Sequence, residues 1–158
     1  MTLTKRAGMG RPFVFVCLLA TLLAGCGAVA MTPPAPSPAD FLGIGAELEA
    51  HGLSLGRIVS GDAGCADSAL TPTAISFDAK GLDQADPVRM YIYIFRNRAA
   101  FERLRASVDT CAASFITDPA TFESVEESPF VVAGQGPWGA DFESALRAGL
   151  TAAAGTGG

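Results

Sequence analysis

The chain has 158 residues, with 16 acidic and 11 basic side chains and a formal net charge of −5. Nucleic acid and anionic lipid headgroups attract Lys and Arg, so this acidic balance disfavours both as direct partners. The length is enough for one domain with a real hydrophobic core, and too short for two.

The first segment has the layout of a signal peptide. Lys5, Arg6 and Arg11 precede an apolar run of 11 residues, Phe13 to Leu23, which only Thr21 interrupts. A basic region followed by an apolar run of this length is typical of a secretory signal. A transmembrane helix needs about 20 apolar residues, so the run is too short to span a membrane.

The end of this run carries a recognisable motif, Leu23-Ala24-Gly25-Cys26. The tetrad resembles the lipobox of bacterial lipoproteins. The resemblance implies cleavage after Gly25 and conversion of the Cys26 thiol to a diacylglyceryl thioether. Residues 1–25 are then the signal peptide, and the lipid on Cys26 makes the membrane a partner, because two or three acyl chains anchor a protein stably.

The residue after the cysteine bears on location. Gly27 is not the Asp that retains some lipoproteins at the inner membrane. The resemblance therefore implies the extracytoplasmic face of the bacterial envelope, and the outer membrane where the host has two. The alternative is an ordinary secretory signal that is cut near Ala28 or Ala30.

Removal of residues 1–25 takes away three basic residues and no acid. The remaining 133 residues carry a net charge of −8 instead of −5. Residues 26–39 are rich in Pro and Ala, a composition that favours an extended tether of about 3.1 Å per residue. Residues 40–154 are expected to form the domain, and residues 155–158 a disordered tail.

The first half of the domain predicts one helix and three strands. Ser37 and Pro38 mark a helix start, Gly52 marks its end, and the residues expected on its buried face are Phe41, Ile44 and Leu48. Strands are expected over Leu53 to Ser60, Thr73 to Phe77 and Val88 to Phe95. We expect Leu53, Leu55 and Val59 on one side of the first strand. The third is apolar on both faces, which predicts a central strand covered on both sides.

The second half predicts a helix, a strand and a last helix. Asn97 is a suitable cap for a helix with a buried stripe of Phe101, Leu104, Val108 and Cys111. Glu126, Glu127 and Ser128 are expected in a solvated turn, Phe130 to Ala133 in a strand, and Ala140 to Ala153 in a helix. The predicted fold is one α+β domain with a mainly antiparallel sheet of about four strands and three helices, ordered α-β-β-β-α-β-α. This layout resembles that of small uncharacterised envelope lipoproteins, and the resemblance of layout implies no function.

Two cysteines remain once Cys17 has left with the signal and Cys26 carries lipid. Cys65 lies in a Gly- and Asp-rich loop, and Cys111 on the buried stripe of a helix. In an oxidising compartment the pair is expected to form a disulfide. The alternative is two buried free thiols.

Few residues suggest catalysis, a metal or a cofactor. His51 is the chain's one histidine, and its place at a helix end suits an interaction with the helix dipole. The acids Asp62, Asp67, Asp78, Asp83 and Asp86 are expected in solvated turns; a loop Ca²⁺ site is the less favoured interpretation. We expect no metal and no cofactor.

The segment Gly134 to Gly139 formally fits the pattern G-x-G-x-x-G. A dinucleotide loop would need another parallel strand after the following helix, and the sequence ends too early for one. The glycines are better explained by a turn that folds Trp138 onto the core. The alternative is an interface formed by Gly134, Gln135, Gly136 and Trp138, with the ring as a partner-contacting anchor.

Two function classes remain. The sequence favours a lipid-anchored binding, inhibitory or structural module that meets an envelope protein or a small ligand, without enzymatic activity. The alternative is an envelope hydrolase that uses carboxylate chemistry. Neither function class implies nucleic acid as a partner.

Overall fold

The computed structural model describes residues 38–155, with side chains from Phe41 onward. The predicted signal peptide, the lipid anchor at Cys26 and the tether up to Ser37 lie outside the described residues, as do residues 156–158. No helix within residues 38–155 has the length and apolar character needed to cross a membrane.

The described residues form three α-helices, two short 3-10 helices and five strands. In chain order these are α2 Pro38–Ala50, β1 Ser54–Ser60, η1 Thr71–Thr73, β2 Ala74–Gly81, β3 Gln84–Ile94, α3 Arg98–Ala112, η2 Pro119–Thr121, β4 Phe122–Glu127, β5 Phe130–Gln135 and α4 Ala140–Gly155.

All five strands belong to one antiparallel sheet with the order β1-β2-β3-β5-β4. The predicted α+β class with one antiparallel sheet and three helices is confirmed. The number of strands and the element order are corrected, because β4 includes Glu126 and Glu127, which were expected in a turn. Only Val125 is fully buried in β4, so this polar edge strand lacks the apolar alternation that identifies a strand in sequence.

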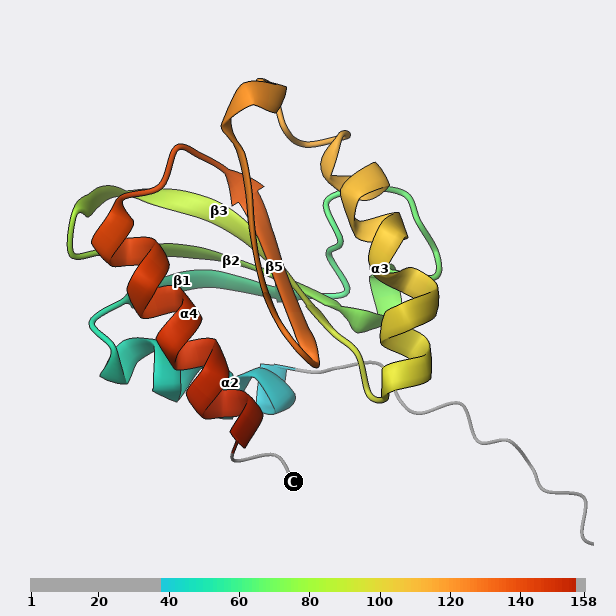
Figure 1. Ribbon diagram of the computed structural model, residues 1–158, viewed down its shortest axis with the longest axis horizontal. Helices are drawn as coiled ribbons and strands as arrows, with labels where there is room; N and C mark the ends of the chain where they lie inside the picture. Colours follow the sequence, from blue (N-terminus) through green and yellow to red (C-terminus); the bar gives the residue numbers. More distant parts are fainter. Residues whose placement is uncertain (1–37, 156–158) are drawn as a thin grey trace, which may run out of the picture. The chain divides into compact units, whose positions relative to one another are not determined.

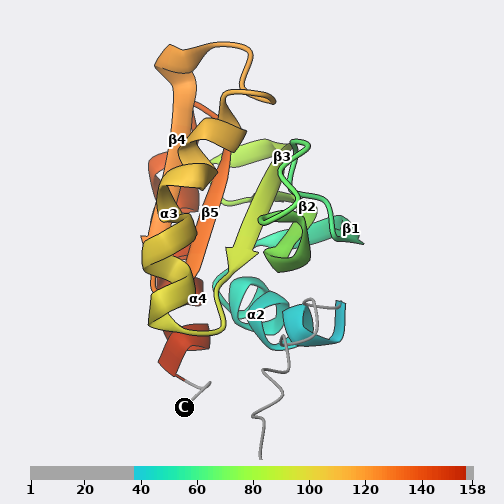
Figure 2. The same cartoon turned by 90° about the vertical axis from the view of Figure 1, so that its right-hand side faces the viewer.

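Helices α2 and α4 cover one face of the sheet (Figures 1 and 2). The predicted buried face of α2 is confirmed, because Phe41, Ile44 and Leu48 are all buried. Helix α4 likewise buries Phe142, Leu146, Leu150 and Ala153. The two helices approach closely at Gly149, where an added Cβ would lie 3.1 Å from the Cα of Leu48. A side chain at position 149 would therefore push α2 and α4 apart.

Helix α3 packs on the opposite face. Its cap is the predicted one, because the Asn97 side chain accepts a hydrogen bond from the backbone N–H of Ala100 at 2.8 Å. Val108 and Cys111 are buried against the sheet, with Phe101 and Leu104 packed beside them. Strand β3, between β2 and β5, is covered on both faces as predicted.

A β-bulge divides β1. Gly56 pairs with Asp78 but Val59 pairs with Ser76, so β1 has one more residue than β2 over this stretch. Arg57 takes up the irregularity with a φ of 44°. An extra residue reverses the faces of all residues beyond it. The prediction that Val59 lies on the same side as Leu53 and Leu55 is therefore wrong.

The tip of the β2–β3 hairpin holds the start of α4. The carboxylate of Asp83 accepts hydrogen bonds from the backbone N–H groups of Phe142 at 2.8 Å and Asp141 at 3.1 Å. These backbone hydrogen bonds, from Asp141 above all, lower the pKa of Asp83. The hairpin thus supplies the N-cap of a helix 58 residues further along the chain.

Candidate binding surface

The candidate binding surface lies along β1, on the same face of the sheet as α3 but at the end of that face that α3 leaves uncovered. Figure 2 shows α3 beside β4 and β5, at the opposite side of the sheet from β1. Near β1, this face carries five polar residues that contact one another, which we call the Arg89 cluster: Arg57, Asp62, Ser76, Asp78 and Arg89.

Arg89 is the centre of the cluster. It pairs with Asp78 across β2 and β3, and its Nη1 donates to Asp78 Oδ1 at 3.3 Å and to the Arg57 carbonyl at 2.9 Å. Its Nη2 donates to Asp62 Oδ2 at 3.2 Å and to the Ser76 hydroxyl. One guanidinium therefore joins three strands and a loop, with geometry that the planar fork of Arg suits.

The bulge in β1 brings a second cation to the cluster. Arg57 Nε donates to Asp78 Oδ2, so the Asp78 carboxylate lies between two guanidinium groups. Arg57 is 77% exposed, whereas the side chain of Asp78 is only 11% exposed. Asp78 was expected in a solvated turn; it is instead a buried residue of β2, because the strand continues to Gly81.

Asp62 is held ionised. Its partial burial tends to raise its pKa, but hydrogen bonds from Ser76, the Gly64 N–H and Arg89 outweigh this, so the pKa of Asp62 is lowered. The Ser76 hydroxyl donates to Asp62 at 2.6 Å, and the Gly64 N–H at 3.0 Å. An acid in this state suits charge pairing and does not suit proton donation.

The loop that carries Asp62 is fixed to α3. Cys65 and Cys111 form the expected disulfide, with their Cα atoms 5.4 Å apart. Beside it the buried Tyr93 hydroxyl donates to the Ala63 carbonyl at 2.8 Å, and burial raises the pKa of Tyr93. Gly64 has a φ of 75°, and an added Cβ would lie 2.5 Å from the Phe115 ring. The position of Asp62 is therefore set by the disulfide and by close packing.

Exposed apolar side chains lie next to the cluster. Ile58 is 43% exposed and Val59 is 48% exposed, and both belong to β1. A shallow hollow of about 140 Å³ opens at the other end of the strand, lined by residues that include Gly56, Asp78 and Lys80. The edge thus combines apolar contact area with ordered charges, as protein-binding surfaces do.

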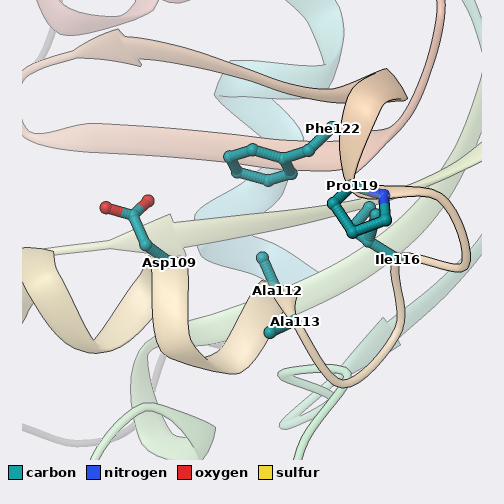
Figure 3. A pocket seen from close by; sticks show the side chains of 6 residues that line it. All are labelled: Asp109, Ala112, Ala113, Ile116, Pro119 and Phe122. Carbon is teal, nitrogen blue, oxygen red and sulfur yellow. The ribbon is translucent and has the colours of Figure 1, made fainter.

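A second hollow lies at the end of α3 (Figure 3). It has a volume of about 240 Å³, and its lining is mostly apolar: Ala112, Ala113, Ile116, Pro119 and Phe122, with the Asp109 carboxylate at one side. Asp109 is already paired with Arg105 at 2.9 Å. The hollow therefore offers apolar contact but no unpaired charge to orient a ligand.

The loop that was considered as an interface is packed into the domain. Trp138 is only 8% exposed, and its Nε1 donates to the Gln135 carbonyl at 3.1 Å. Gly134 is buried as well, and a Cβ added to it would lie 3.1 Å from the Trp138 ring. Trp138 closes one end of the core, as the favoured interpretation predicted.

The same loop has few backbone donors to offer to a phosphate. The N–H groups of Gly136 and Trp138 donate to the Thr121 carbonyl at 2.6 Å and to Glu123 Oε1 at 2.9 Å. The first N–H groups of α4 donate to Asp83. A phosphate-binding loop directs such groups at its ligand. Here they are used within the protein.

The other candidate residues have local roles. His51 Nδ1 lies 2.8 Å from the Glu47 carbonyl at the end of α2. Asp67 accepts from the N–H groups of Ala69 and Leu70 in a turn. Within residues 38–155, no three His, Cys, Asp or Glu side chains form a group that could hold a metal ion.

Sequence reasoning did not find the Arg89 cluster. A usable signal in the sequence is the alternation of polar residues from Ser76 onward, which places Ser76, Asp78 and Lys80 on one face of β2. No protein family, no curated protein and no solved structure matches this chain. The geometry of the described residues therefore carries the functional inference.

Proposed function

We propose that this chain is a lipid-anchored extracytoplasmic protein that acts as a binding module through β1 and the Arg89 cluster. The observation that carries the binding role is the combination of ordered charges with exposed Ile58 and Val59 on one edge of the sheet. The lipobox supports the anchor, and a disulfide suits an oxidising compartment outside the cytoplasm.

The alternative of a carboxylate hydrolase gains no support from this site. Glycoside hydrolysis needs one carboxyl group that keeps a proton at the working pH, beside a second that is ionised. Asp62 and Asp78 are both bound to the Arg89 guanidinium, and the pKa of Asp62 is lowered. Both acids therefore suit charge pairing.

The anchor is tested by labelling cells with a fatty-acid analogue. The Cys26→Ser variant should lose the label and leave the membrane fraction, because the thioether can form only on Cys26. Cys17→Ser is the matched control and should keep the label, since Cys17 lies in the predicted signal. Equal labelling of Cys26→Ser and wild type would contradict the anchor.

The binding role is tested by site-specific photo-cross-linking in intact cells. A cross-linker at Val59 should give defined adducts, whereas one at Leu42, which is 71% exposed on α2, should not. The side chains of Val59 and Leu42 are both well exposed, but they lie on different surfaces of the domain. Equal yields from both would contradict a binding role for the β1 edge.

A further inference from the structure

We propose that β1 binds an extended, acidic polypeptide segment, which adds to the sheet as a sixth strand. This inference rests on the proposed binding function and names the class of its partner. It follows from three properties of the β1 edge: its place in the sheet, the exposure of its side chains and the sign of its exposed charges.

The place in the sheet indicates strand addition. β1 is hydrogen-bonded to β2, and among residues 38–155 no second strand flanks it on its other side. An edge strand presents backbone donors and acceptors along its outer side, and an extended peptide can bind them. Four consecutive residues of β1, from Arg57 to Ser60, are exposed.

The exposed side chains suit a polypeptide partner. Ile58 and Val59 are β-branched, and such residues stabilise a neighbouring strand through cross-strand contacts. A small free anion would use only the guanidinium groups and would leave this apolar area in water. The partner therefore needs apolar side chains as well as charged ones.

The charges exposed at the β1 edge predict the sign of the charge on the partner. Arg57 is 77% exposed and Lys80 is also exposed, whereas Asp78 is almost buried between Arg57 and Arg89. Asp62 is 38% exposed, but it accepts hydrogen bonds from Arg89, Ser76 and Gly64. Arg89 and Asp62 are similarly exposed and pair with each other, so the outermost charges of this edge are those of Arg57 and Lys80, and an acidic partner is complementary to them.

The same charge argues against a second copy of this chain. Antiparallel pairing of two β1 strands around their middle would bring the two Arg57 side chains together, and like charges opposite each other are destabilising. This repulsion opposes self-association and favours a partner that carries acids opposite Arg57.

The test uses the full processed chain in mild detergent and two synthetic peptides of eight residues. One alternates Glu with Val and the other alternates Lys with Val. Residue-resolved amide hydrogen exchange should show slower exchange in β1 with the Glu-Val peptide and little change with the Lys-Val peptide. No slowing in β1 with either peptide, or equal slowing with both, would overturn the proposal.

Variants separate charge from folding. Arg57→Glu should weaken binding of the Glu-Val peptide about fivefold and improve binding of the Lys-Val peptide. Arg98→Glu is the control, because Arg98 is 88% exposed on α3, and it should change neither affinity. If Arg57→Glu does not fold, Lys80→Glu should weaken binding of the Glu-Val peptide in the same direction. An unchanged affinity in the folded variant would overturn the proposal.

The two proposals can fail separately. Slower exchange in β1 without fatty-acid labelling of Cys26 would support strand addition and refute the anchor. Labelling of Cys26 without slower exchange in β1 would keep the anchor and refute strand addition. Cross-linking of Val59 only to lipid or to a second copy of this chain, and to no other polypeptide, would also refute the addition of an acidic strand.

Discussion

The two edges of the sheet are built in opposite ways. In β4, Val125 is fully buried, Glu126 pairs with Arg105 of α3, and Glu127 pairs with Arg147 of α4 at 3.1 Å. In β1, Ile58 and Val59 are exposed, and α3 does not pack against them. Charged side chains and covering helices are the usual protection of a sheet edge. The helices and ion pairs thus cover β4, whereas Ile58 and Val59 of β1 stay exposed, as the proposed binding role requires.

The largest expected effect comes from the disulfide, which fixes the loop beside β1. A bond that spans 46 residues should contribute about 4 kcal/mol by the chain-entropy argument. The double variant Cys65→Ser, Cys111→Ser should lose about this free energy of unfolding in urea, and its amide exchange should rise more in β1 than in β4. Wild-type protein with its disulfide reduced is the control, and it should show the same loss of unfolding free energy and the same rise in amide exchange. A loss under about 1 kcal/mol would contradict the assignment.

Arginine substitutions compare the charged groups of the two edges. Arg89→Met should cost about 2 kcal/mol, because Asp78 and Ser76 are buried and each loses a donor. Arg105→Met should cost less than about 1 kcal/mol, since its partners Asp109 and Glu126 are about half exposed. Urea denaturation measures both. Equal costs would show that the Arg89 cluster is no more buried than a surface ion pair.

A matched pair of valines compares the packing of the edges. Val125→Ala in β4 should cost about 1.6 kcal/mol, at about 0.8 kcal/mol for each buried methylene equivalent. Val59→Ala in β1 should change the free energy of unfolding by less than about 0.5 kcal/mol, because the side chain is half exposed. A similar loss at both positions would contradict the difference between the edges.

Lowering the pH is expected to have the smallest effect on the free energy of unfolding, through Asp62 in the loop that follows β1. The pKa of Asp62 in the folded protein is below its ordinary value of 3.8. Its stabilising effect is therefore present above about pH 4 and is lost as the pH falls through the folded-state pKa. The difference in unfolding free energy between wild type and Asp62→Asn should shrink from pH 5 to pH 2, as followed by circular dichroism. A constant difference would contradict the ionised state of Asp62.

Local patterns predicted the elements whose burial is regular. Strand β3 alternates apolar residues on both faces, and α3 repeats its stripe from Phe101 to Cys111, so both were found from sequence. Strand β4 was missed because charged pairs, and not apolar alternation, hold its side chains. The side of Val59 was wrong because a bulge leaves no clear mark in composition.

The candidate site was harder to predict than the fold. Asp62, Asp78 and Arg89 come from a loop and two strands, and each is an ordinary polar residue in its own segment. Only the register of β2 on β3 and the disulfide bring them together. Asp83 is a similar case, since its role depends on a helix 58 residues away.

The packing of α2 on α4 has a consequence for how the chain matures. Synthesis delivers a chain from its N-terminus, so α2 is made before the helix α4 that it packs against. Until residues 140–155 have emerged, the apolar face formed by residues such as Phe77 and Ile92 lacks the cover of α4. A chain that stopped before Ala140 would keep this face exposed to proteases and chaperones. The close fit of α2 on α4 at Gly149 can therefore form only after the last residues of the domain have been made.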